Sequence, residues 1–186
     1  LTNDKDGQAV AWSNTGSALE RLHRYDEALT AYGTARALVE LTNDKDGQAV
    51  AWSNTGSALE RLHRYDEALT AYDTARTLAE QINNKDSQAA AWNGTGLALR
   101  GLFRYDAAIS AGWRAVSIFK ELGDYTSAGE ALGELAETLG AADVDIVKVS
   151  EVWLLSADAY KKAGASEEVA RVYKKVKQAE SGQVHE

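Results

Sequence analysis

The chain has 186 residues, of which 45% are hydrophobic and 26% are charged, and its formal net charge is −8. This length and composition suit one globular domain or one short repeat array, while the acidic balance argues against nucleic acid as a partner. Cysteine is absent, which excludes disulfides and thiolate metal sites, and no apolar run reaches the ~18 residues of a transmembrane helix.

The first forty residues are repeated almost unchanged. Between 1–40 and 41–80, 37 of 40 positions are identical, and the differences are Gly33/Asp73, Ala37/Thr77 and Val39/Ala79. Residues 81–120 match 41–80 at 18 positions, and residues 121–160 keep the outline more loosely. A period of this length indicates a solenoid.

Each forty-residue unit is predicted to form two helices, since proline is absent and alanine is frequent. In the first unit, Asn3 or Asp4 can cap a helix that runs roughly from Lys5 to Leu22. Its apolar and small residues recur every three or four positions: Ala9, Trp12, Gly16, Leu19 and Leu22. His23 and Arg24 form a turn, and the second helix starts near Tyr25 with the stripe Ala28, Leu29, Tyr32, Ala35 and Leu38. So short a turn predicts an antiparallel hairpin.

These residues resemble the tetratricopeptide repeat, whose pattern is Trp-x2-Leu-Gly-x2-Tyr, then Ala-x3-Phe, then Pro, over about 34 residues. The first unit carries Trp12-x2-Thr15-Gly16-x2-Leu19 and Ala28-x3-Tyr32. The corresponding residues of the next two units are Trp52, Thr55, Gly56, Leu59, Ala68, Tyr72, Trp92, Thr95, Gly96, Leu99, Ala108 and Gly112. Threonine replaces leucine, the closing proline is missing, and the unit is six residues longer.

The chain is therefore similar to the long, roughly 40-residue variant in kinesin light chains and in sensor domains of large bacterial signalling ATPases. The resemblance implies an all-α, right-handed superhelical solenoid of antiparallel helix hairpins. In this fold, we expect Gly16 and Ala28 to allow close helix approach, with Trp12 and Tyr32 filling the space beside them.

Two registers overlap near the C-terminal end. As part of a fourth unit, Trp153 aligns with Trp113, but with an offset of 61 residues it aligns with Trp92. A helix at about 144–163 can then close one hairpin and open another with a helix at about 166–179. The last helix has the apolar stripe of a C-terminal cap, Val169, Val172, Tyr173 and Val176. The basic residues here favour a solvated face: Lys161, Lys162, Arg171, Lys174, Lys175 and Lys177.

The predicted array is single and covers 1–186: repeats at 1–40, 41–80, 81–120 and 121–163, a cap helix at 164–180 and a tail at 181–186.

The N-terminal end of the predicted array has no cap helix. The first helix is virtually identical to that of the second unit, which must be buried on both sides. Its outward side is thus expected to have a neighbour, either in a longer parent protein or in another chain. The start at Leu1, without a methionine, also predicts a cut fragment or a removed tag.

No catalytic constellation is recognised. His23 and His63 occupy equivalent turns and could hold a metal between repeats, but Phe103 at the same turn favours an apolar packing position. Glu130, Glu134 and Glu137 recur on one helical face, as in a solvated or partner-facing stripe, and Asp143, Asp145 and the third histidine, His185, complete the candidates. Asn93-Gly94-Thr95-Gly96 falls inside a helix and is not a nucleotide loop. We predict no enzyme, no metal and no cofactor.

Tetratricopeptide arrays bind peptides in a concave groove lined by the first helix of each hairpin, and the resemblance places that groove on specific residues here. They are Val10, Ser13, Asn14, Ser17, Glu20, Arg21, Val50, Ser53, Asn54, Ser57, Glu60, Arg61, Ala90, Asn93, Leu97, Arg100, Glu130, Gly133 and Glu137. Asn14 and Asn54 can hydrogen-bond a peptide backbone. Solvent-tolerant helix positions would show the same composition.

Family members that bind chaperone tails use a clamp of Lys, Arg and Asn. Asn54 fits one such position, but Ser13, Ala90 and Gly94 stand where basic residues are expected, so we predict no tight binding of acidic chaperone tails.

The leading hypothesis is a non-catalytic, cytoplasmic interaction scaffold that binds a protein or peptide and is part of a larger protein. The alternative is a self-associating or engineered repeat protein whose uncapped N-terminal face stacks on another chain. A small-molecule sensor domain is a third hypothesis. Neither a membrane nor a nucleic acid is expected as a partner.

Overall fold

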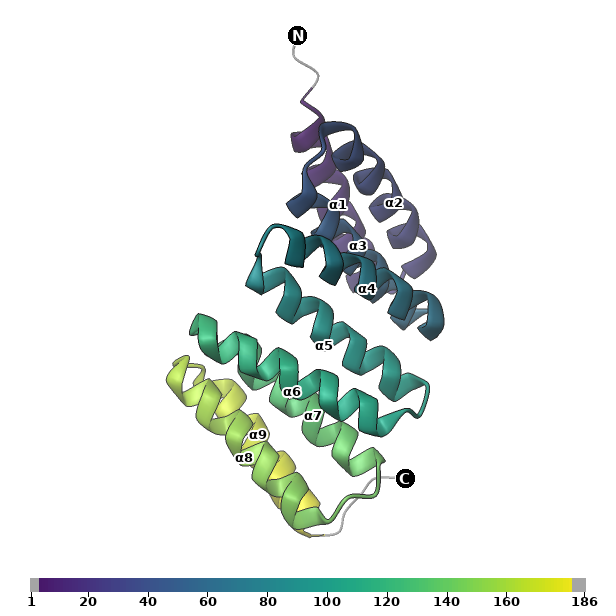
Figure 1. Ribbon diagram of the computed structural model, residues 1–186. Coiled ribbons are helices and arrows are strands. Elements are labelled where there is room, and N and C mark those ends of the chain that lie inside the picture. Colours follow the sequence, from purple (N-terminus) through teal and green to yellow (C-terminus); the bar gives the residue numbers. More distant parts are fainter. Residues whose placement is uncertain (1–3, 182–186) are drawn as a thin grey trace. The chain divides into compact units, whose positions relative to one another are not determined.

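The computed structural model describes residues 4–181, so Asn3, His185 and most of the predicted tail lie outside the described residues. The chain divides between Leu102 and Phe103 into two compact units, which are described separately. The first unit contains α1 (Lys5–Arg21), α2 (Tyr25–Thr42), α3 (Lys45–Arg61), α4 (Tyr65–Gln81) and α5 (Lys85–Gly101) (Figure 1). The second contains α6 (Tyr105–Leu122), α7 (Tyr125–Ala141), α8 (Ile146–Lys162) and α9 (Ser166–Glu180).

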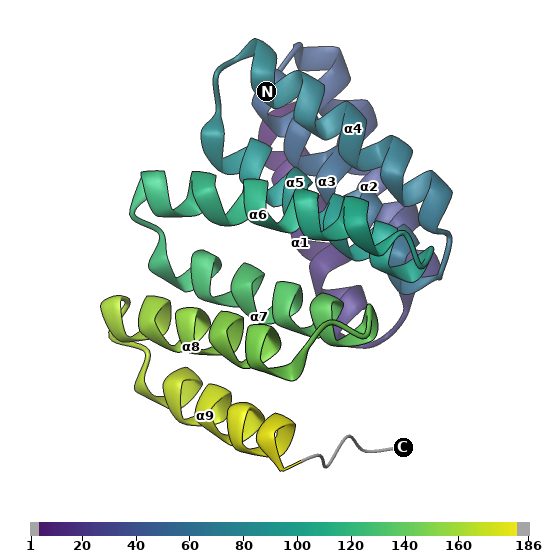
Figure 2. The ribbon, with the colours of Figure 1, turned by 60° about the horizontal axis from the view of Figure 1, so that its bottom comes forward.

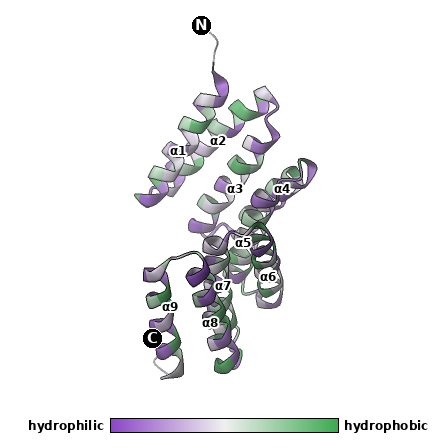
Figure 3. Cartoon of the chain, turned by 90° about the vertical axis from the view of Figure 1, so that its left-hand side faces the viewer, coloured by the Kyte–Doolittle hydropathy of each residue, from purple (hydrophilic) through white to green (hydrophobic). Residues whose placement is uncertain are grey.

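Within each unit, consecutive helices pack against one another. In the first unit α3 contacts α1 and α5 in addition to its chain neighbours α2 and α4. In the second unit, α6 to α9 are stacked in chain order (Figure 2). Hydrophobic and hydrophilic residues alternate along the helices, as expected of elements that bury one side (Figure 3).

The helices begin at regular steps of twenty residues, at 5, 25, 45, 65, 85, 105 and 125. The next start, at 146, is one residue late, and α9 follows at 166. This added residue explains the two overlapping registers of the sequence, because α8 begins 61 residues after α5.

Side-chain caps recur every forty residues. Asp4 Oδ1 accepts a hydrogen bond from the backbone N–H of Gly7 at 2.9 Å, and Asp44, Asn84 and Asp124 cap α3, α5 and α7 in the same way. These bonds satisfy amides that have no partner inside the helix. They confirm the predicted cap at Asp4.

The turns inside the hairpins use left-handed backbone at a non-glycine residue. His23, His63 and Phe103 have φ of 57°, 58° and 59°. Phe103 is 77% exposed, so the expectation of an apolar packing position at this turn is wrong. The side chain projects from a sharp turn and meets the ring of the next tyrosine edge-on, as the two histidines do, which explains why either residue type is accepted.

The core of the first unit is built from tyrosines, alanines and glycines. Tyr32 on α2 is 1% exposed and its ring lies directly on Gly16 of α1. Tyr72 on α4 lies between Gly56 of α3 and Gly94 of α5. Ala28 is fully buried in the same cluster as Tyr32, so the predicted roles of Gly16, Ala28 and Tyr32 are confirmed. Trp12, in contrast, is 43% exposed, because no described helix covers α1 on its outer side.

In the second unit, the ring of Tyr160 on α8 packs on Gly129 of α7, so closely that a Cβ atom at this glycine would lie 3.0 Å from the ring. Beside it, the buried Ser156 hydroxyl donates a hydrogen bond to the Gly129 carbonyl at 2.7 Å. Val172 and Val176 of α9 are buried as expected, whereas Tyr173 is exposed and its hydroxyl accepts a hydrogen bond from Lys161 Nζ at 2.8 Å.

Replacing Gly94 by alanine tests the tyrosine–glycine contact. A methyl group at Gly94 would collide with the ring of Tyr72, so Gly94→Ala is expected to lower the free energy of unfolding by about 1–3 kcal/mol. Gly33→Ala is the control, because a methyl group there meets no atom within 4 Å and should raise stability by about 0.5–1 kcal/mol. Urea denaturation measures both values, and equal effects would contradict the close packing.

Candidate functional site

The predicted groove residues of the first unit lie on α1, α3 and α5, where they recur every three or four positions. All of them are exposed or half-buried, and Val10 and Val50 remain 60% and 43% exposed. The helix α3, which carries the middle set, contacts both α1 and α5. Glu130, Gly133 and Glu137 lie on α7 in the second unit.

Two of the predicted groove residues also hold the core tyrosine in place. The Tyr32 hydroxyl donates a hydrogen bond to Glu20 Oε2 at 3.0 Å and lies 3.3 Å from Ser17 Oγ. Burial, together with the nearby Glu20 carboxylate, raises the pKa of Tyr32 to about 12 although the Ser17 hydrogen bond opposes the shift. The Tyr32 hydroxyl is therefore a neutral hydrogen-bond donor at physiological pH. It links α2 to Ser17 and Glu20, two candidate groove residues of α1.

The buried tyrosines Tyr32 and Tyr72 lie beneath the candidate groove helices, and the sequence pattern does not indicate this supporting role. The pattern predicts a space-filling role for Tyr32, and both Tyr32 and the equivalent Tyr72 are buried. Their position directly under the glycines of α1, α3 and α5 also makes them the support of the groove surface. The available signal is the aromatic residue of the Ala-x3-Tyr pattern, which follows Gly16 and Gly56 at the same distance in the chain.

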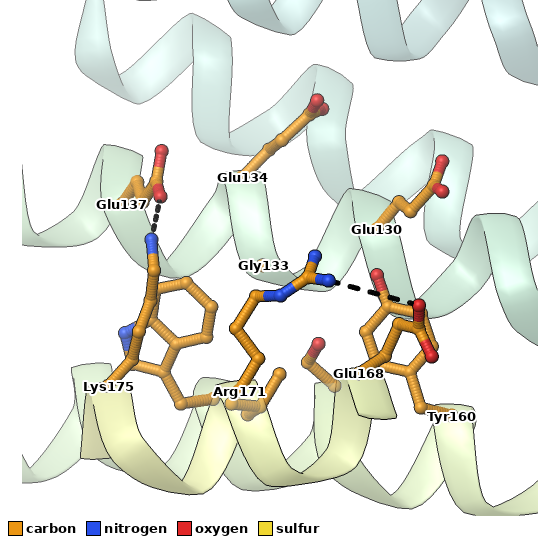
Figure 4. Close-up of a pocket in the computed structure, with 11 residues that line it drawn as sticks. Glu130, Gly133, Glu134, Glu137, Tyr160, Glu168, Arg171 and Lys175 are labelled. Atoms are coloured by element: carbon orange, nitrogen blue, oxygen red, sulfur yellow. Dashed lines mark hydrogen bonds and ion pairs between the residues drawn. The ribbon is translucent and has the colours of Figure 1, made fainter. Parts of the chain in front are cut away.

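In the second unit, α7, α8 and α9 line an open cavity of about 210 Å³ (Figure 4). Glu130, Gly133 and Glu137 form one wall with Glu134, and Trp153, Ser156 and Tyr160 of α8 line it as well. The facing wall comes from α9, with Glu168, Arg171, Val172 and Lys175. The sequence indicates the α7 wall and the helix hairpins, but it does not indicate which side chains of α8 and α9 face α7 across the cavity.

One ion pair joins the α7 and α9 walls of this cavity, and a second lies within the α9 wall. Lys175 Nζ lies 2.5 Å from Glu137 Oε1 and 4.8 Å from the ring centre of Trp153. Arg171 approaches Glu168 at 4.0 Å (Figure 4). The basic residues of α9 are thus partly engaged with carboxylates rather than forming a purely solvated face.

The surroundings of Glu130 on α7 disfavour the ionised form of its carboxyl group. Part of its side chain is exposed, but partial burial, followed by repulsion from Asp124 and Glu168, raises its pKa. Burial, followed by repulsion from Glu130 and Glu168, raises the pKa of Tyr160. The carboxylates of the cavity can accept hydrogen bonds from a ligand and can pair with a positively charged ligand group. Among the residues that line the cavity, none is an activated nucleophile.

The two candidate metal-binding histidines are engaged in their own turns. His23 Nδ1 lies 2.6 Å from the Tyr25 hydroxyl, and His63 Nδ1 lies 2.6 Å from that of Tyr65. Over residues 4–181, no three His, Asp or Glu side chains are grouped so that they could hold a metal ion. Across the same range, no helix has the length and apolarity to cross a membrane.

The profile of the Tetratricopeptide repeat family matches residues 7–81 and 47–121, and the chain therefore belongs to this family. No curated protein matches the sequence. Solved structures of similar fold include the following two. A putative kinesin light chain of Podospora anserina with nearly identical TPR-like repeats has a TM-score of 0.69 and 12% identity over 100% of both chains. A Rap protein complexed with competence and sporulation factor has a TM-score of 0.68 and 12% identity over 97% of this chain and 66% of that chain.

These matches confirm the predicted all-α fold of the TPR-like, kinesin-light-chain type. The fold is that of a protein-interaction repeat scaffold. The role of the groove residues stays a prediction.

Substitution of Glu130 tests the electrostatics of the cavity. Because the folded state favours the protonated carboxyl, ionisation of Glu130 destabilises the fold at pH 7, and the penalty disappears as the pH falls below its ordinary pKa of 4.5. Glu130→Gln should therefore raise the free energy of unfolding slightly at pH 7, by about 0.5 kcal/mol, and not at pH 4. Glu151→Gln, at another exposed glutamate of this unit, is the control in urea denaturation at both pH values. A gain at pH 4 as large as at pH 7 would contradict the prediction.

Proposed function

We propose that the chain is a non-catalytic scaffold that binds an extended peptide across α1, α3 and α5. The observation that carries this proposal is the row of small and amide side chains on these three helices, which lie side by side. Ser13, Asn14, Ser53, Asn54 and Asn93 leave room for a peptide backbone and offer donors and acceptors along it. The Rap protein of similar fold was crystallised with a bound factor, which supports a ligand-binding role.

Binding should be distributed over the repeats. Each helix offers a few hydrogen bonds of modest net strength, about 0.5–1.5 kcal/mol apiece, so affinity depends on contacts summed over neighbouring helices. Since Ser17 and Glu20 already contact Tyr32, we assign ligand contacts first to the asparagines.

A random-sequence peptide library selected against the whole chain tests the proposal. Asn54→Ala should weaken binding of the selected peptides by about tenfold, the equivalent of 1.4 kcal/mol. Thr77→Ala is the matched control, because it reproduces a difference that already exists between α2 and α4 and lies on an exposed side of α4. Calorimetry measures both affinities. Peptides that bind Asn54→Ala and the wild type equally would place the ligand elsewhere.

A second function, self-association, is favoured by a comparison inside the chain. Helices α1 and α3 have the same sequence, KDGQAVAWSNTGSALER. In α3, Ala51, Thr55 and Ala58 are buried, whereas the equivalent Ala11, Thr15 and Ala18 of α1 are exposed. The outer side of α1 is therefore a surface whose sequence is compatible with a covering helix, and we propose that a second copy covers it.

The ends of α1 favour an antiparallel arrangement of the two copies. Asp4 and Asp6 lie at the N-terminal end, and Arg21 lies at the other. Two α1 helices packed across a two-fold axis would bring the acidic end of each next to the basic end of its partner. In the second repeat, the equivalent alanines of α3 are buried inside the chain, where α3 contacts α2.

Substitution on α1 tests this second function. Ala18→Arg should shift the molar mass from a concentration-dependent value above 20.1 kDa to a constant 20.1 kDa, because it places a bulky charge in the contact. Ala37→Arg, at an exposed alanine of α2, should leave association unchanged. Size-exclusion chromatography with light scattering gives the mass, and a wild-type chain of constant 20.1 kDa would overturn the proposal.

A further inference from the structure

The first unit contains a cleft on α2, α3 and α4 that includes none of the predicted groove residues. Its volume is about 410 Å³. Leu29, Trp52 and Leu59 provide apolar surface. The charged residues of the lining are Arg36, Arg64 and Glu67, and Gly33, Thr55, Thr70 and Ala71 complete it. Leu29 and Trp52 pack against the buried core of this unit, and because they are only half-buried, part of each side chain remains accessible in the cleft.

One of the three differences between the first two repeats lies in this cleft. In α4, Asp73 forms an ion pair with Arg76 three residues later, and Glu80 holds the same guanidinium from the other side at 2.6 Å. In α2 the position of Asp73 is taken by Gly33, and a side chain there would meet no atom within 4 Å. The cleft is therefore open where the sister repeat has a carboxylate.

Without a carboxylate at position 33, Arg36 is paired less closely than Arg76 of the sister repeat. Within the described residues, Arg36 has one ion pair, in which Nε lies 3.8 Å from Glu40, beyond hydrogen-bond distance. Its guanidinium lies 4.1 Å from the ring centre of Trp52, compared with 5.0 Å for Arg76 above Trp92. Arg36 is thus held over an indole without a close carboxylate partner, and it is 30% exposed.

The other charges of the cleft are already balanced. Arg64 donates two hydrogen bonds of 2.7 Å to the two carboxylate oxygens of Glu67. A bidentate pair of this kind leaves little attraction for a third group. Arg36 is consequently the cation of the cleft that can receive a ligand.

We propose that this cleft binds a carboxylate-bearing side chain of an acidic partner peptide. The ligand carboxylate pairs with Arg36 in the place that the Asp73 carboxylate occupies beside Arg76 in α4. An adjacent leucine-type side chain contacts Leu29, Trp52 and Leu59. Glycine at position 33 lowers helix stability relative to other residues. Because it has no side chain, it also leaves the cleft open at this position.

The sister repeat supplies the variant that tests the proposal. Gly33→Asp reproduces the α4 sequence at this position and should fill the carboxylate place from within. Gly33→Ala is the matched control, since it improves helix propensity without adding a carboxylate. Both variants should melt at or above the wild-type temperature, so a loss of binding in Gly33→Asp cannot come from unfolding.

The probes are two capped peptides, acetyl-Leu-Glu-Leu-Glu-amide and its glutamine counterpart acetyl-Leu-Gln-Leu-Gln-amide. Titration is followed by the NMR shifts of the amide at position 33 and of the Trp52 indole N–H. The wild type, Gly33→Ala and the groove variant Asn54→Ala should bind the glutamate peptide about tenfold more tightly than the glutamine peptide. In Gly33→Asp this preference should disappear, although the Trp52 indole is still present to report binding. Equal binding of both peptides by the wild type, an unchanged preference in Gly33→Asp, or no shift at millimolar peptide would overturn the proposal.

Discussion

The spacing of the helices in the first unit depends on one type of contact, a tyrosine ring lying on the backbone of a glycine. Tyr32 rests on Gly16, and Tyr72 rests on Gly56 and Gly94. Since the ring fills the volume that a side chain would need, the helix carrying the glycine can approach the tyrosine helix closely. The same contact supports the face of α1, α3 and α5 from below, so that packing and the candidate binding surface have a common origin.

Much of this architecture is local, and for that reason it could be predicted from the sequence. The cap at Asp4, the helix starting at Tyr25 and the small residue at Gly16 follow from short patterns that the repeat shows several times. The environment of a helix is not local. Helices α1 and α3 share one sequence, yet Trp12 of α1 is 43% exposed whereas the equivalent Trp52 of α3 is half-buried. The burial of a side chain depends on the neighbouring helix and not on the residue itself.

The candidate sites show the same division. The resemblance to the tetratricopeptide repeat assigns the groove residues of the first unit to α1, α3 and α5, and the structure shows them exposed or half-buried on these helices. The cavity of the second unit brings Glu137 of α7 to Lys175 of α9, a pair separated by 38 residues. A pattern confined to one helix carries no information about such a pair, and the late start of α8 interrupts the repeat that could have indicated it.

The regular twenty-residue step between helix starts has a consequence for how such a chain can change its length. Insertion of a few residues inside a helix would rotate every following side chain away from its partner. Duplication of one complete unit, by contrast, brings its own cap, its own turn and its own tyrosine–glycine contact, as the pair 1–40 and 41–80 shows. Recombination between the nearly identical gene segments can therefore add or remove a whole hairpin in one event while every remaining contact keeps its register.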